Sequence, residues 1–216
     1  MKRRTFILTS IAGISLPHWA TAASKAYAII ERPKDLTSKE PPDDEAAKEE
    51  LGEDGIIVNG RLIPKADFGE IAKLANKWRP GDTLLVFRDQ INKTAPNRKK
   101  DSDGIIGDAA HASRKSDHNP WIIEAGVGVV SAIDITNDKA GGCDVASIVE
   151  KLRTSKDSRI KYVIWNKRIY NSQEVNGSPA WEWRPYKGSN DHSHHMHLSV
   201  KSNKESYDSG APWPIA

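Results

Sequence analysis

The sequence contains a single cysteine, Cys143, among its 216 residues. One cysteine excludes an intramolecular disulfide framework and a zinc site built from several cysteines. The 32 basic and 29 acidic residues nearly balance, and no stretch forms the dense basic run that is typical of nucleic-acid-binding proteins. We therefore expect one folded domain with appendages that does not bind nucleic acid.

An apolar run long enough to cross a membrane is also missing near the N-terminus. The apolar stretch Phe6–Leu16 contains about 11 residues, too few for a hydrocarbon core about 30 Å thick. It follows a basic cluster that includes Arg3-Arg4 and precedes small residues around Ala23. This order is typical of an export signal, so we expect residues 1–28 to direct the chain to the periplasm or the exterior, without a stable membrane anchor. The arginine pair resembles a twin-arginine signal, with an ordinary secretory signal as the alternative.

Composition divides the rest of the chain into segments. Residues 29–55 carry ten acidic and four basic residues. Such a segment cannot bury much apolar surface, so we expect a flexible acidic linker. We predict an N-terminal extension over residues 56–83, the main domain over residues 84–202 and a C-terminal tail over residues 203–216.

The apolar pattern of the globular part mixes two periods. Spacings of three and four predict helices, whereas β-branched runs and strict alternation predict strands. The helices are expected at residues 68–78, 84–91 and 145–152, and the strands within 56–64 and at 128–135, 162–165 and 195–200. Helices followed by short strands and irregular loops indicate an α+β fold, which we predict as a small antiparallel sheet flanked by helices.

The predicted strand at residues 195–200 carries two histidines on one face. Successive side chains of a strand point to opposite faces, so His195, His197 and Ser199 share one face. The opposite face holds only apolar side chains, as a core stripe does. The two imidazoles would lie about 7 Å apart along the strand, close enough to serve one site.

A carboxylate and a third imidazole complete a possible metal site. Asp134 lies between two isoleucines in a strand that is expected to be buried, where a carboxylate is costly unless it is paired or bound to metal. His118 lies in a loop that ends at Pro120. Two imidazoles and one carboxylate leave an open fourth position on zinc, which is the catalytic arrangement. The alternatives are an ordinary loop histidine, an aspartate paired with a lysine or arginine, and a weak chelator at the histidine-rich segment 192–197.

Several segments, in this order, resemble one family. They read GDAAHASRKSDHNP, GVVSAIDIT, IKYVIWNKRIY, WRPY and HHMHLSV. They are similar to zinc peptidases of the M15 and murein-endopeptidase type, a superfamily of D-alanyl-D-alanine carboxypeptidases, peptidoglycan endopeptidases and Hedgehog-like domains. The resemblance implies that residues 84–202 form a zinc peptidase domain whose sheet holds one Zn²⁺ ion.

The resemblance also assigns roles to individual residues. His118, Asp134 and His197 match the metal ligands, and Ser116 matches a serine two residues before the first of them. His195 would lie beside the attacking water and move its proton. The family's Glu-x-x-His is missing here, so His192 and Asp191 are the alternatives for that role. His118 and Asp134 are 16 residues apart, farther than in the family, which predicts a longer hairpin or loop between them.

Substrate contacts are expected from two further groups. Arg114 is the candidate for binding a substrate carboxylate, together with Ser116, because a guanidinium can bind a carboxylate through two hydrogen bonds. A surface arginine is the alternative. Trp181, Trp183 and Tyr186 fit either a groove for glycan or peptide or an edge of the hydrophobic core.

These observations predict an exported, monomeric zinc peptidase that hydrolyses stem peptides or cross-links of peptidoglycan. Whether it acts as a carboxypeptidase or as an endopeptidase stays open. The alternative is a non-catalytic, metal-containing relative that binds the cell wall, which the missing glutamate keeps open. A nuclease is suggested only by the sequence Asp117-His118-Asn119, and it explains neither the export signal nor Asp134.

Overall fold

The computed structural model describes residues 30–31, 55–64, 75, 77–106 and 116–216. The fold is α+β, with two small sheets and few helices in this part of the chain. The expected export signal, most of the expected linker, Arg114 and most of the helix expected at residues 68–78 lie outside the described residues. None of the described helices is long and apolar enough to span a membrane.

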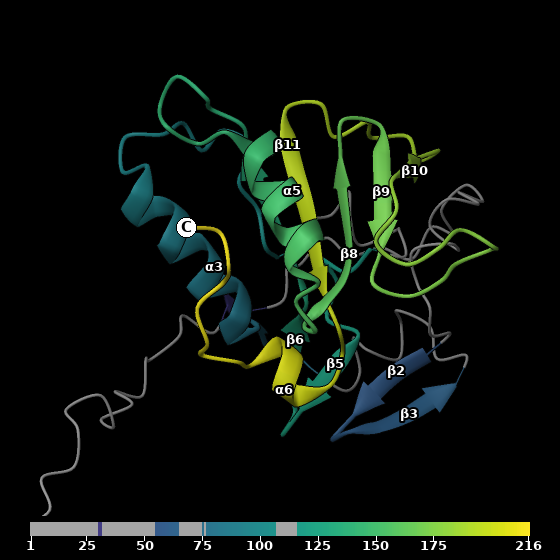
Figure 1. Cartoon of the computed structure of the whole chain (residues 1–216). Helices are drawn as coiled ribbons and strands as arrows, with labels where there is room; N and C mark the ends of the chain where they lie inside the picture. The colour runs from purple at the N-terminus through teal and green to yellow at the C-terminus, as the bar shows by residue number, and fades with distance from the viewer. Residues whose placement is uncertain (1–29, 32–54, 65–74, 76, 107–115) are drawn as a thin grey trace, which may run out of the picture.

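The first sheet, entirely antiparallel, has five strands in the order β10-β9-β8-β11-β7. Their bounds are β7 Ala132–Thr136, β8 Ile160–Trp165, β9 Arg168–Asn171, β10 Arg184–Pro185 and β11 His195–Val200. Helix α5 (Val145–Ser155) packs against β8 and β11 on one face of this sheet (Figure 1). The core on this face includes the apolar stripe of β11: Met196, Leu198 and Val200. The opposite face of β11 therefore holds its polar side chains.

The second sheet has six strands in the order β1-β4-β6-β5-β2-β3 and mixes parallel and antiparallel pairs. Their bounds are β1 Ile30–Glu31, β2 Gly55–Val58, β3 Arg61–Pro64, β4 Lys77–Pro80, β5 Ile122–Glu124 and β6 Val127–Val130. Residues 56–83 thus contribute strands that pair with β5 and β6 of the main domain. Trp78 was predicted at the end of a helix, and this is wrong, because it lies in β4 and is buried.

The hairpin of β5 and β6 occupies the long interval between His118 and Asp134. Its turn residues, Ala125 and Gly126, both have positive φ angles, as a tight hairpin turn requires. Of the two expected alternatives, a longer hairpin or a loop, the interval forms the hairpin.

The predicted single strand at residues 128–135 is wrong, because the chain changes sheets within it. β6 ends at Val130 in one sheet and β7 begins at Ala132 in the other. Ser131 lies between them, and its N–H donates to the carbonyl oxygen of Asp117. An apolar, β-branched run fits a buried strand in either sheet, so its pattern does not reveal the change.

The other predicted elements agree with the structure. Helix α3 (Asp82–Thr94) contains the expected residues 84–91, and Asp144 caps α5 by accepting from the backbone N–H of Ser147. The short helix α6 (Lys204–Tyr207) packs against α3. In the tail that follows, Trp213 is buried, and its indole N–H donates to the carbonyl oxygen of Thr83. Residues 203–216 therefore complete the hydrophobic core over α3.

Gly128 of β6 lies against the turn that carries His118. A Cβ atom at this position would come within 2.7 Å of the Cβ of Pro120 and within 3.1 Å of the ring of Trp78. We expect Gly128→Ala to lower the free energy of unfolding by about 1–3 kcal/mol, because a rigid proline ring must move. Denaturant titration measures this, with Gly210→Ala as the control because a Cβ there meets no atom within 4 Å. Equal losses in the two variants would contradict the prediction.

Candidate metal centre

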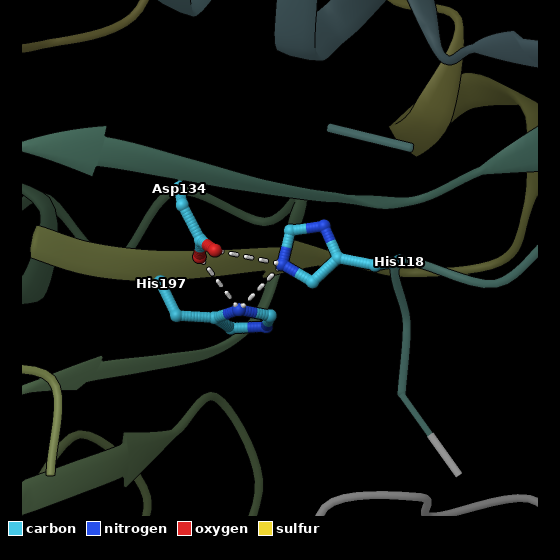
Figure 2. Close-up of side chains that lie close together, drawn as sticks. All are labelled: His118, Asp134 and His197. Atoms are coloured by element: carbon cyan, nitrogen blue, oxygen red, sulfur yellow. Dashed lines mark hydrogen bonds and ion pairs between the residues drawn. The ribbon is translucent and has the colours of Figure 1, made fainter. Parts of the chain in front are cut away.

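The side chains of His118, Asp134 and His197 converge on one point (Figure 2). The neighbours of His197 and Asp134 along β11 and β7 belong to the core on the α5 side, so the cluster lies on the opposite face of the first sheet. His197 of β11 pairs directly with Asp134 of β7. The Nδ1 atom of His197 lies 3.1 Å from Oδ1 of Asp134, and Nε2 of His118 lies 3.2 Å from Oδ2. The same two imidazole nitrogens lie 3.2 Å from each other. Three of the predicted site residues therefore meet at one point.

Hydrogen bonds on the far side of each ring orient both imidazoles. Nδ1 of His118 lies 2.7 Å from the carbonyl oxygen of Ile105, which can only accept, so this nitrogen carries the proton. Nε2 of His197 lies 2.9 Å from Oγ of Ser199, whose hydroxyl donates to the carboxylate of Asp117. Nε2 of His197 is therefore the donor. When both rings are neutral, each turns a lone pair toward Asp134.

These atoms fit a divalent metal ion. Two lone pairs and a carboxylate that face each other at 3.1–3.2 Å need a positive charge between them, either a proton or a metal ion. In a tetrahedral site with bonds of about 2.0–2.1 Å, ligand atoms lie about 3.3 Å apart, which is close to the distances here. Two imidazoles and one carboxylate suit zinc and leave its fourth position open.

Charge coupling within the cluster is strong. Burial alone would raise the pKa of Asp134, but the attraction of His118 and hydrogen bonds from His118 and His197 hold it well below its usual range. Burial lowers the pKa of His118, but the nearby carboxylate of Asp134 outweighs this and raises it. Burial lowers the pKa of His197. Of the two imidazoles, His118 therefore binds a proton more readily than His197, and a metal ion would compete with that proton.

His195 and His192 lie beside the three ligand candidates. Nε2 of His195 is 3.8 Å from Oδ2 of Asp134, and the ring of His192 lies 5.0 Å from that of His195 and 5.7 Å from that of His197. Nδ1 of His192 donates to the carbonyl oxygen of Asn190 at 2.7 Å, so its Nε2 carries the lone pair. Asp134, His192 and His195 form a second group of possible ligand atoms that shares the aspartate.

Burial is the main cause that lowers the pKa of His192 to about 3, and the neighbouring His197 adds to it. His192 is therefore neutral near neutral pH. Its Nε2 can accept a hydrogen bond there, but it does not take up a second proton to become an imidazolium.

Ser116, expected at the substrate, contacts the backbone of the His118 turn. Its hydroxyl accepts from the N–H of His118 at 3.3 Å, and its carbonyl oxygen accepts from the N–H of Asn119 and the indole of Trp121. These bonds orient the turn that presents His118. Asp191, an alternative proton carrier, accepts from both the N–H and the hydroxyl of Ser193.

The three aromatic residues that were expected either in a substrate groove or at an edge of the core do not all lie in the same place. Trp181 and Trp183 pack on Tyr170 at the edge of the main core. Tyr186 instead contacts the ring of His192, at 5.4 Å between centroids, so it belongs to the side of the metal cluster.

Three residues around His197 have no assigned role in the sequence prediction. Tyr162 stacks on its ring at 5.4 Å and 9°, and Asp117 and Ser199 form the hydrogen-bond chain described above. Alternation along the strand already places Ser199 on the histidine face of β11, without indicating its role. Asp117 has no such signal, because only the fold brings it beneath β11.

Comparison with protein-family models, with curated proteins and with solved structures finds no match to this chain. The chemistry of the cluster is therefore inferred from its contacts and from the sequence motifs that carry its residues.

The lowered pKa of His192 predicts a pH-dependent stability. Its pKa falls from 6.5 to about 3 on folding, so unfolding takes up a proton at this ring below about pH 6.5, and stability decreases toward pH 3. Between about pH 7.5 and about pH 5.5, we expect metal-free wild type to lose about 1.4 kcal/mol more than His192→Asn. Asparagine tolerates the positive φ of this position and does not titrate. Denaturant titrations at the two pH values measure the difference, and equal losses in both proteins would contradict it.

Proposed function

We propose that this chain is an exported zinc peptidase that hydrolyses peptide bonds in the stem peptides or cross-links of peptidoglycan. The observation that supports this best is the cluster of His118, Asp134 and His197, in which both imidazoles are buried and the carboxylate is partly buried, with two further imidazoles beside it. The resemblance of residues 84–202 to peptidoglycan-cleaving zinc peptidases supplies the substrate class. The signal-like residues 1–28 support export of the chain, which agrees with a substrate that lies outside the cytoplasm.

The three ligand candidates have the composition that metal-assisted amide hydrolysis needs. A zinc ion held by His118, Asp134 and His197 would polarise a carbonyl oxygen and acidify water at its open position. The backbone and side-chain hydrogen bonds behind each imidazole keep both lone pairs aimed at one point. The ligands are therefore oriented before any ion binds, which reduces the ordering that binding requires.

His195 is the residue that we propose to move protons. It lies two residues before His197 on the same face of β11, and its ring is 3.8 Å from Asp134. From this position it would take a proton from the attacking water and return it to the leaving amine. His192 is less suited, because an imidazole with a pKa of about 3 is too weak a base to hold the proton taken from water at neutral pH. Its Nε2 would accept a hydrogen bond and orient His195 or the water.

The substrate would approach the face lined by Tyr186 and His192. The aromatic ring of Tyr186 provides an apolar contact at this edge. A carboxylate of the stem peptide would bind Arg114, the residue that the sequence motif provides for this contact.

Zinc binding is the first test of the proposal. We expect the purified wild-type protein to bind one zinc ion per chain, and His118→Ala and Asp134→Ala to lose most of this affinity because each removes a ligand. Metal analysis after dialysis measures the stoichiometry. His194→Ala is the matched control, because this neighbouring histidine is exposed and is not part of either ligand group. Equal zinc content in His118→Ala and wild type would contradict the site.

Peptidoglycan digestion is the second test. We expect the zinc-loaded protein to release products from purified peptidoglycan that mass spectrometry detects, and a chelator to abolish them. His195→Ala should retain one zinc ion but lose roughly 10²–10⁴-fold in rate, as expected for loss of a proton-transfer group. His194→Ala should retain the wild-type rate.

The products also identify the bond. Loss of one terminal D-alanine would indicate a carboxypeptidase, and cleaved cross-links would indicate an endopeptidase. If the protein binds one zinc ion but cleaves no bond in any type of cell wall, the peptidase proposal is wrong and a wall-binding relative takes its place.

A further inference from the structure

A chain of buried polar groups runs from His197 away from the ligand cluster. Nε2 of His197 donates to Oγ of Ser199 at 2.9 Å, and the hydroxyl of Ser199 donates to the carboxylate of Asp117. Ser199 is fully buried on β11, and the exposed fraction of Asp117 is only 2%. Solvent therefore reaches these groups too little to replace their hydrogen bonds.

Lys161 of β8 compensates the charge at the end of this chain. Its ammonium nitrogen lies 3.0 and 3.2 Å from the two carboxylate oxygens of Asp117. A buried carboxylate without such a partner would be costly, so the ion pair lets Asp117 stay charged beneath the sheet. The next residue of β8, Tyr162, stacks on the ring of His197. One strand thus fixes both the plane of the imidazole and the carboxylate behind it.

We propose that Asp117 is a positioning residue for the metal centre, acting through Ser199 to fix the tautomer and the orientation of His197. The inference rests on the proposed metal site. Asp117 does not contribute an atom to either ligand group. Its negative charge attracts the proton of the Ser199 hydroxyl, which makes Oγ a better acceptor for the Nε2 proton of His197. This leaves Nδ1 as the nitrogen with the lone pair and makes it more basic, so a metal ion binds more tightly.

The sequence carries this arrangement in two separated places. Asp117 immediately precedes one candidate ligand, His118, and Ser199 follows the other, His197, by two residues. The loop that supplies one ligand therefore also supplies the charge that orients the other. This arrangement couples the two imidazoles, because displacement of the His118 turn would also move Asp117.

Zinc affinity of the full chain tests the inference. Competition with a chromophoric chelator gives the dissociation constants of wild type, Ser199→Ala, Asp117→Asn and the double variant. We expect each single variant to bind zinc roughly 10–100-fold more weakly. Because Asp117 acts through Ser199, the double variant should bind no more weakly than Ser199→Ala alone. Two independent effects would instead multiply.

A matched control separates positioning from loss of structure. Asp157 is paired with Arg159 as Asp117 is with Lys161, and it takes no part in either ligand group. Asp157→Asn should therefore change stability without changing zinc affinity. The visible spectrum of the cobalt(II)-loaded protein provides a second readout, and we expect Asp117→Asn to shift its bands while Asp157→Asn does not. Asp117→Asn keeps the side-chain volume, so it tests the inference even if Ser199→Ala does not fold.

The outcomes separate this inference from the proposed function. If wild type binds no zinc, both are wrong. If wild type binds one ion and both single variants match its affinity, the metal site stands and the role of Asp117 is wrong. If the losses multiply in the double variant, Asp117 does not act through Ser199 and the inference is overturned.

Discussion

The antiparallel register that places His197 opposite Asp134 is the constraint on which the rest of the structure depends. A shift of β11 by one residue would turn every side chain to the other face of the sheet. It would carry the imidazoles into the core and expose the apolar stripe that packs under α5. The burial of that stripe, Met196, Leu198 and Val200, therefore fixes the geometry of the cluster on the opposite face. Hydrophobic burial on one side of the sheet sets polar chemistry on the other.

The cluster holds charged side chains in a region with little solvent, where a charge without a partner costs free energy. Asp117 is buried and Asp134 is partly buried, and each is compensated by specific partners: two imidazoles for Asp134, an ammonium and a hydroxyl for Asp117. Removing one partner would leave a buried charge without compensation, which costs more than the pair contributes. Such a network is consistent with a site that must hold a fixed geometry.

Much of the cluster could be predicted from the sequence, because side chains alternate between the two faces of a strand. Alternation alone places His195, His197 and Ser199 on one face, and the two isoleucines around Asp134 mark it as a polar side chain of a buried strand. The helix at residues 145–152 was equally local. These predictions needed only neighbours along the chain.

The features that could not be predicted from the sequence depend on contacts between distant segments of the chain. The run from Val127 to Thr136 has one uniform pattern, yet its halves pair with different partners in different sheets. Trp78 fits a helical spacing, but pairing with β6 places it in a strand. Lys161 lies 44 residues after Asp117, so no local pattern links them. Tertiary pairing decided each of these cases.

The hairpin of β5 and β6 joins the two sheets into one unit. Its strands pair with β2 on one side and β4 on the other, so they lie at the centre of the second sheet. The same hairpin begins just after His118 and leads directly into the strand of Asp134. A shorter interval between these two residues would therefore remove the partners of the N-terminal strands as well as a loop. In this chain, the spacing of His118 and Asp134 and the existence of the second sheet cannot vary independently, and insertions or deletions near the cluster must preserve both.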